Sequence, residues 1–183
     1  MLRIRFRRFD HARDLKRLFD FMMNESNQIL FSHSFTVHDI PMFEIWLSRK
    51  LDRNEYHDFF MIEDSNGNTV GFTFSYEFFM YDAHCKYTLC LFEEYRNCGL
   101  GVIAGVKMID YLFRKYPLNR IFVSVFDYNK NSLSSNLKGG FEEVGTFPDY
   151  RFYGGEYYSL HILTISRDKF YTKQKKVISN LKD

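Results

Sequence analysis

The residues from Arg96 to Gly101 read RNCGLG and lie between a strand-like run, YTLCLF, and a helix-like run, VIAGVKMIDYLFRK. The first turn of a helix leaves about four backbone N–H groups without partners and carries roughly half a positive charge. Glycines at 99 and 101 remove the Cβ atoms that would keep an anion away, and Arg96 can add a charged donor. The pattern therefore predicts either a phosphate-binding loop or a tight turn, because its spacing matches neither the dinucleotide fingerprint nor the P-loop.

The cysteines and histidines form no second reactive motif. Cys85, Cys90 and Cys98 make neither an even disulfide set nor a CxxC metal pattern, which is typical of a reducing compartment. A thiol at a helix N-terminus can act as a nucleophile, which is one interpretation of Cys98. An incidental cysteine is the commoner interpretation. His84 and His161 have no partner at metal-binding spacing, so we expect no metal site.

The elements before the loop are a strand, two helices and a hairpin. Residues 2–9 alternate arginine with apolar side chains, as in a strand with one solvent-facing side. Apolar residues recur at helical spacing after Asp10, which predicts a capped amphipathic helix. After a loop over residues 24–36, a second helix is expected from about Asp39, and Asn66-Gly67 predicts a hairpin turn. The apolar face of the second helix would hold Phe43, Trp46, Leu47 and Leu51.

The elements after the hairpin predict a parallel strand pair with a helical crossover. A strand over residues 84–92 leads into the loop and into a helix that ends before Pro117, with Val102, Val106, Ile109 and Phe113 on its apolar face. A buried strand follows from Arg120, then a short helix closed by Gly139-Gly140, then strands at about 142–153 and 156–166. This order predicts a mixed α/β single domain over residues 1–170 and a basic tail over 171–183. We expect the tail to be a solvated, frayed helix.

Composition narrows the class of protein further. The chain has 183 residues, of which 45% are hydrophobic and 19% aromatic, which is typical of a globular protein. A net charge of +2 is too small for a duplex-binding surface, so we expect no nucleic-acid partner. No apolar run is long enough for a membrane span, and the arginine-rich N-terminus is unlike a signal peptide. We therefore predict a cytoplasmic protein without membrane contact.

Two segments together resemble the most diagnostic part of the GNAT superfamily of N-acetyltransferases. These are YTLCLFEEYRNCGLG and VSVFDYNKNSLSSNLKGGF, which match the R/Q-x-x-G-x-G/A motif and, about thirty residues later, N-x-x-S with a Lys-x-Gly-Phe ending. The matching positions are Leu91, Arg96, Gly99, Gly101, Asn129, Ser132, Lys138, Gly140 and Phe141. The expected element order is also that of the family, so the resemblance extends from Leu2 to about Phe170.

The resemblance implies a GNAT fold, a mostly antiparallel twisted sheet with one splayed parallel strand pair, flanked by helices. It also implies acetyl-coenzyme A (acetyl-CoA) as co-substrate, with its pantetheine arm between the splayed strands. Leu89 and Leu91 would contact pantetheine, and Asn129 and Ser132 would lie near the arm. The pyrophosphate cradle would consist of Arg96, Asn97, Cys98, Gly99, Leu100, Gly101 and Val102.

The catalytic donor is the first departure from the family pattern. A departing thiolate benefits from a proton donor, which many family members supply from a tyrosine seven residues after the motif asparagine. This chain has Asn136 there. An amide can form hydrogen bonds but cannot act as an acid at neutral pH, so Tyr128 or a water molecule is an alternative donor.

The identity of the general base is also left open. An ammonium group must lose a proton before it attacks a thioester, and Glu77, Glu93, Glu94 and His84 are the titratable groups near the expected cleft. Glu77 is our candidate, although a solvent-facing strand glutamate is the ordinary alternative. Several relatives carry an acidic residue where this chain has Lys86.

The predicted activity is transfer of an acetyl group from acetyl-CoA directly to a primary amine. The resemblance is closest to the branch that contains ribosomal-protein N-terminal acetyltransferases and spermidine acetyltransferase. The acceptor could accordingly be a small molecule, an amino sugar, a polyamine or a protein N-terminus, and a homodimer is left open. The alternative is a non-catalytic GNAT-fold module that binds coenzyme A or a partner, which the departure at Asn136 favours.

Overall fold

The computed structural model describes residues 3–31, 39–52 and 58–180 and contains one seven-stranded sheet with the strand order β1-β2-β3-β4-β5-β7-β6. The strands are β1 (Ile4–Arg7), β2 (Phe59–Asp64), β3 (Thr69–Phe79), β4 (His84–Leu91), β5 (Arg120–Phe126), β6 (Glu142–Tyr153) and β7 (Glu156–Ser166). The helices are α1 (His11–Met23), α2 (Glu25–Gln28), α3 (Ile40–Leu51), α4 (Leu100–Lys115), α5 (Lys130–Gly139) and α6 (Arg167–Asn180), with a 3-10 turn at Glu93–Tyr95. Neighbouring strands are antiparallel except β4 and β5, which confirms the predicted fold class.

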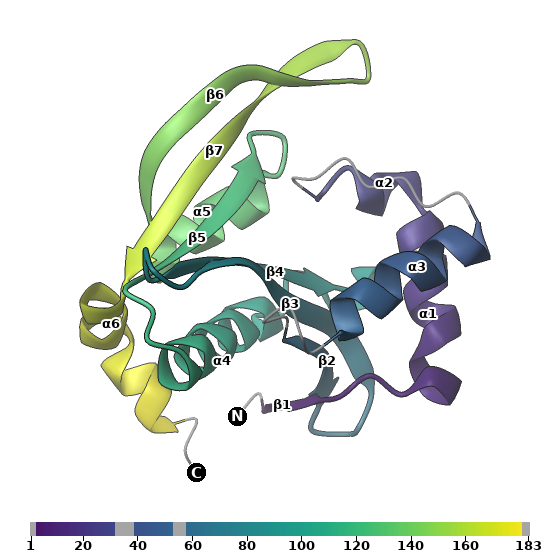
Figure 1. The fold of residues 1–183 in the computed structure, drawn as a ribbon, viewed down its shortest axis with the longest axis horizontal. Coiled ribbons are helices and arrows are strands. Elements are labelled where there is room, and N and C mark those ends of the chain that lie inside the picture. Colours follow the sequence, from purple (N-terminus) through teal and green to yellow (C-terminus); the bar gives the residue numbers. More distant parts are fainter. Residues whose placement is uncertain (1–2, 32–38, 53–57, 181–183) are drawn as a thin grey trace.

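The helices cover the sheet from both faces (Figure 1). Helices α1 and α3 pack on the aromatic face of β2 and β3, where Phe43, Phe59 and Phe72 are almost fully buried. Helices α4 and α6 cover the other face, with Met108, Phe113 and others against β4, β5 and β7. Burial of this many aromatic and aliphatic side chains is the main stabilising contribution.

The predicted helix starts are confirmed by their caps. The carboxylate of Asp10 accepts a hydrogen bond from the Arg13 N–H at 3.1 Å, and Asp39 caps α3 in the same way through the Met42 N–H. Both side chains satisfy an N–H group that the first helical turn leaves open. The turn at Gly67, with φ of +82°, joins β2 to β3 as predicted.

Three details differ from the sequence prediction. The expected loop after α1 contains the short helix α2, which is capped by Asn24. Val102, expected on the buried face of α4, is 55% exposed in the first turn of that helix. The C-terminal residues, expected to form a solvated, frayed helix, are helical as part of α6, but Gln174 and Ile178 are buried.

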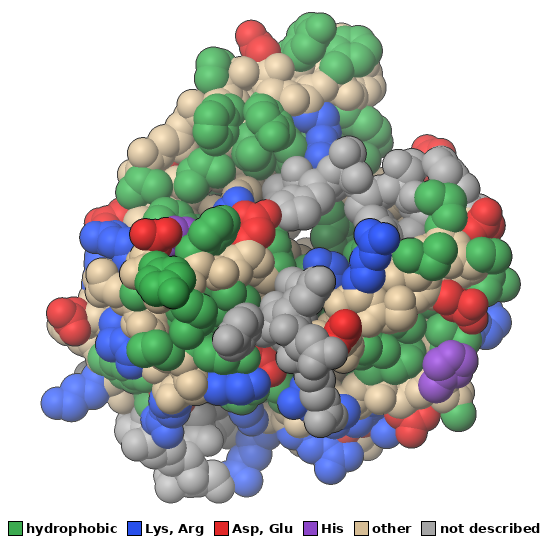
Figure 2. All heavy atoms as spheres, viewed as in Figure 1, with side chains coloured by type: hydrophobic (Ala, Val, Ile, Leu, Met, Phe, Trp, Pro, Cys, Tyr) green, Lys and Arg blue, Asp and Glu red, His purple; other side chains and the backbone are tan. Residues whose placement is uncertain are grey.

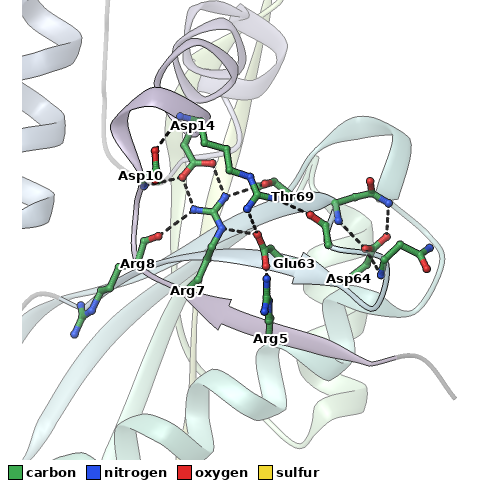
Figure 3. Close-up of polar contacts among 12 residues, drawn as sticks. Arg5, Arg7, Arg8, Asp10, Asp14, Glu63, Asp64 and Thr69 are labelled. Atoms are coloured by element: carbon green, nitrogen blue, oxygen red, sulfur yellow. Dashed lines mark hydrogen bonds and ion pairs between the residues drawn. The ribbon is translucent and has the colours of Figure 1, made fainter.

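A corner of buried charge ties β1, α1, β2 and β3 together (Figure 3). Glu63 is fully buried and forms ion pairs with Arg5, Arg7 and Arg13. Arg7 also forms a bidentate pair with the buried Asp14 at 2.5 and 2.6 Å. Burial alone would raise the pKa of Glu63, but hydrogen bonds from Arg7 and Arg5 and the nearby charges outweigh it and lower that pKa.

Within the described residues, none of the helices has the length and apolarity that crossing a membrane would require. The cytoplasmic location stays a prediction.

Candidate functional site

The parallel strands β4 and β5 separate soon after they begin. They pair only at His84–Arg120, Cys85–Ile121 and Lys86–Phe122, whereas β4 stays paired to β3 through Leu91 and β5 stays paired to β7 through Phe126. The two strands therefore leave a wedge between them that no strand fills. This is the splayed pair that the sequence predicted.

A cavity of about 490 Å³ lies along this wedge. Its lining comes from β4, α4, β5, α5 and α6, with Phe141 just before β6. Phe21, Leu30 and Phe31 add a side from the N-terminal third of the chain. Apolar and polar side chains both contribute substantially to its wall. A cavity of this size is typical of a ligand site.

The turn at Gly99 presents backbone donors to this cavity. Gly99 has φ of +86°, a left-handed conformation that favours glycine, and it precedes α4 without a side-chain cap. In the part of the chain that the structure describes, the N–H groups of Leu100 and Gly101 donate no hydrogen bond. Unpaired N–H groups at the positive end of a 16-residue helix suit an anion such as a phosphate.

Gly101 is not required by the packing of the protein itself. A Cβ atom added there would lie 3.5 Å from Leu91 Cδ1, which is ordinary van der Waals contact. The fold would accept a side chain at this position, but Gly101 lines the cavity, so the side chain would take up space beside the open N–H groups of the first turn. The residues present therefore fit a pyrophosphate group.

Arg96 lies in the cavity wall with two of its donor atoms already engaged. Its Nε donates to the Leu91 carbonyl at 3.1 Å, and its Nη2 donates to Asn27 Oδ1 at 2.7 Å. These bonds join the end of β4 to α2, so Arg96 braces the cleft whether or not it also contacts an anion.

The second motif contributes the opposite wall. Asn129 caps α5 by accepting a hydrogen bond from the Ser132 N–H at 3.3 Å, and both residues line the cavity. Asn136 also lines it, and its amide nitrogen donates to the Ser132 carbonyl at 2.9 Å. The cavity wall includes nine of the eleven residues that we predicted to bind the cofactor: Leu89, Leu91, Arg96, Asn97, Gly99, Gly101, Val102, Asn129 and Ser132.

The other two predicted cofactor residues lie outside the wall. Cys98 is exposed, and its thiol donates to the Tyr95 carbonyl. Leu100 is buried in a small core cluster with Ile62 and Ala104. Only their backbone groups could take part in an anion site.

The candidate acid and base residues Glu77 and Tyr128 are not part of the cavity wall. Glu77 lies at a bulge of β3 with φ of +49° and forms an ion pair with Lys86 at 2.6 Å. The Tyr128 hydroxyl donates to the Ile29 carbonyl, and burial raises its pKa, an effect that the neighbouring Arg151 opposes. Glu94 forms a surface ion pair with Arg17.

Among the described residues, Arg96 is the only charged side chain in the cavity wall. The wall includes no carboxylate and no histidine from those residues, and no cluster of three potential metal ligands occurs among them. Cys90 lies in the wall as a neutral thiol, because burial raises its pKa to about 12 even though Arg96 opposes the shift.

Sequence reasoning did not single out Tyr87, which lines the cavity from β4. A Cβ atom added at Gly105 would lie 3.6 Å from the Tyr87 hydroxyl, so this phenol lies against α4 where the helix has no side chain. Burial raises the pKa of Tyr87 and keeps it protonated. The alternation along β4 and the small residue Gly105 were the available signals. No signal in the sequence pointed to Phe21, Leu30 and Phe31, because only the tertiary fold brings them to the cleft.

Comparison with known proteins agrees with this geometry. Residues 8–162 match the family described as "Acetyltransferase (GNAT) domain". The chain is 23% identical to an uncharacterized SPbeta prophage-derived N-acetyltransferase, YokL, from Bacillus subtilis, over 68% of this chain and 70% of that protein.

Solved structures share the fold at lower sequence identity. Spermidine N-acetyltransferase from Vibrio cholerae, in complex with CoA and spermine, superposes with a TM-score of 0.80 at 19% identity, covering 92% of this chain and 97% of that one. A dodecameric structure of the same Vibrio cholerae enzyme gives a TM-score of 0.75 at 19% identity, covering 92% and 95%. With a family match over most of its length, this chain belongs to the GNAT family and is an N-acetyltransferase.

Proposed function

We propose that this protein transfers an acetyl group from acetyl-CoA, held in the wedge between β4 and β5, directly to a primary amine. The observation that carries the proposal is the continuity of one cavity, from the open N–H groups at the start of α4 to the gap between the strands. Acetyl-CoA would supply an activated thioester, and the chain's own residues would bind and orient it. A relative of the same fold has been solved with CoA.

The coenzyme end of the site would be held by the backbone of Asn97 to Val102. The exposed backbone edge of β4 from Leu89 to Leu91, facing the wedge, would hydrogen-bond an extended arm as another strand would. Asn129 and Ser132 would contact the pantetheine arm from the α5 side. These roles follow from the unpaired donors and from the wedge itself.

The amine end offers no base among the described wall residues. We propose that the acceptor amine loses its proton through water to solvent and then attacks as the neutral form, with Glu77 acting only if it moves. The rate should then follow the amine's own pKa, with kcat/KM rising as pH approaches that value. The Asn136 amide could form a hydrogen bond in the cleft but would not donate a proton to the departing thiolate.

The acceptor class follows from the charge of the wall. A polyamine carries several positive charges and would need several carboxylates around it. The described wall has none and contains Arg96. We therefore propose a monoamine on a neutral or apolar body, such as a small amine, an amino sugar or a protein N-terminus, in contrast to the spermine bound by the Vibrio cholerae enzyme.

Self-association through the β6–β7 hairpin is part of the proposal. Apolar side chains gather on this hairpin, which extends beyond the rest of the fold (Figures 1 and 2). The exposed ones are Val144, Phe147, Tyr150, Phe152, Tyr153 and Tyr157. A large exposed apolar patch marks an interaction surface, and a homodimer would cover it. Light scattering on a size-exclusion column would find a monomer if this is wrong.

The test of the activity is a thiol-release assay with an amine panel, preceded by calorimetric titration with acetyl-CoA. The panel would hold spermidine, benzylamine, glucosamine and a short peptide with an unblocked N-terminus. We expect binding, and turnover on one or more monoamines with spermidine poorest. Binding without turnover on any amine would refute the catalytic proposal, and preference for spermidine would refute the acceptor class.

A further inference from the structure

Three segments that are distant in the sequence meet at one backbone carbonyl, that of Ile29 at the end of α2. The Tyr128 hydroxyl, between β5 and α5, donates to it. Arg151 Nη1, on β6, donates to the same oxygen at 2.9 Å and lies 3.0 Å from Tyr128 Oη. Figure 1 shows α2 lying across from the β5–α5 connection, with the far end of the hairpin above both. We name Tyr128, Arg151 and the Ile29 carbonyl the clasp.

Aromatic packing fixes both donors of the clasp. The guanidinium of Arg151 lies 4.0 Å above the centre of the Phe126 ring, and the Tyr128 ring stacks on the same phenylalanine at 5.2 Å. Tyr158 meets the Tyr128 ring edge-on at 4.9 Å. The pairing of β6 with β7 is irregular between Phe147 and Arg151, and such an irregularity re-aims a side chain. These contacts therefore hold the Tyr128 and Arg151 side chains in place independently of their hydrogen bonds to Ile29.

The clasp adjoins two parts of the cavity wall. Ile29 is followed by Leu30 and Phe31, which line the cavity, and Tyr128 is followed by Asn129, which lines the opposite side. Tyr128 and Arg151 are not in the wall themselves. Arg96 holds the same turn from the β4 side through Asn27. The Leu30–Phe31 wall is thus fixed from two directions.

We propose that Tyr128 and Arg151 are positioning residues that hold the Leu30–Phe31 wall and so set the room for the acceptor amine. The role rests on the proposed acetyl transfer at this cleft. It also reassigns Tyr128: its O–H points to the Ile29 carbonyl, so it supplies no proton to a departing thiolate. The residues that contact the coenzyme lie elsewhere in the cleft.

The test compares Tyr128→Phe, Arg151→Met and Arg151→Lys with Tyr81→Phe, a matched loss of a hydroxyl from a fully exposed tyrosine between β3 and β4. Tyr128→Phe should raise KM for the amine about 5-fold, the effect of one hydrogen bond, and Arg151→Met about 10-fold or more, because a charged donor is lost. Arg151→Lys should restore part of the loss, since it keeps the charge without the fork. The Kd for acetyl-CoA, kcat and the pH profile should not change, and Tyr81→Phe should behave as wild type.

Hydrogen exchange gives a readout that does not depend on activity. The amides of Leu30 and Phe31 donate to Asn27 and Gln28 at 3.1 Å, and loss of the clasp should make them exchange about 10-fold faster. Unchanged exchange and unchanged KM in folded Tyr128→Phe and Arg151→Met would overturn the clasp. A loss in kcat with unchanged KM for Tyr128→Phe would return Tyr128 to the role of proton donor. If wild type turns over no amine, the proposed function fails while the exchange result still decides the clasp.

Discussion

Gly99 and Gly101 occur in the same turn for different physical reasons. Gly99 adopts a left-handed backbone that side chains rarely accept, so its identity follows from the turn. Gly101 has neither a positive φ nor a crowded Cβ position, so the fold alone leaves its identity unexplained. A ligand lying against the helix N-terminus would account for it. This contrast is the residue-level support for the anion site.

Asn136 is expected to contribute little to either binding or turnover. Its amide nitrogen already donates to the Ser132 carbonyl within α5, which leaves the carbonyl oxygen of the side chain, an acceptor that cannot protonate a thiolate. Asn136→Ala should change kcat and the Kd for acetyl-CoA by less than about 3-fold, because the lost bond is local and partly exposed. A large loss of kcat in steady-state kinetics would show that the amide has taken the role of the missing tyrosine.

At the scale of elements, local signals predicted most of the fold. Caps at Asp10 and Asp39, the Asn66-Gly67 turn and the β-branched strand from Arg120 each act within a few residues, so the sequence alone identifies them. The docking of α6 was not predictable, because Phe170 and Ile178 are buried in a cluster whose other members lie mostly on α4 and on strands distant in the sequence. The cavity positions of Phe21 on α1 and of Leu30 and Phe31 after α2 were not predictable either, since they also depend on contacts between distant segments.

Gly71 on β3 controls how closely β3 and β4 approach at the cleft. A Cβ atom there would lie 2.2 Å from the Cys90 carbonyl oxygen and 2.9 Å from Leu91 Cα, and both are backbone atoms that cannot swing away. Gly71→Ala should lower the free energy of unfolding by about 1–3 kcal/mol through overpacking. Because Cys90 and Leu91 line the cavity, acetyl-CoA affinity should fall as well.

Chemical denaturation of Gly71→Ala and of Gly145→Ala provides the comparison. Gly145 lies on β6 with nothing within 4 Å of its Cβ position, so the same substitution there should be nearly neutral. Equal stability of the two variants would contradict the close approach of β3 and β4.

At the scale of the whole molecule, the buried charge at the corner of β1, α1 and β2 makes stability depend on pH. Because the pKa of Glu63 is lower in the folded protein than in the unfolded chain, its contribution is complete above about pH 5. The contribution is lost as the pH falls through the lowered value. Acid should therefore destabilise the fold at this corner.

Glu63→Ala should cost about 3–5 kcal/mol at pH 7, because it leaves the largely buried Arg7 without one of its partners. The difference from wild type should shrink as the pH is lowered, since wild type loses the same charge. Denaturant titrations at several pH values would measure this, with Glu94→Ala as the surface control at less than about 1 kcal/mol. A difference that stays constant with pH would contradict the lowered pKa.

The central claim is that the turn at Gly99 and Gly101 holds the pyrophosphate of acetyl-CoA, and calorimetric titration of the folded protein tests it most directly. The comparison is wild type, Gly101→Glu, and Gly145→Glu, which adds the same carboxylate in open space on β6. Gly101→Glu places a negative charge and a bulky side chain over the open N–H groups, so affinity should fall about 100-fold or more. Gly145→Glu should bind as wild type does. Unchanged affinity in a folded Gly101→Glu variant would contradict this placement of the coenzyme.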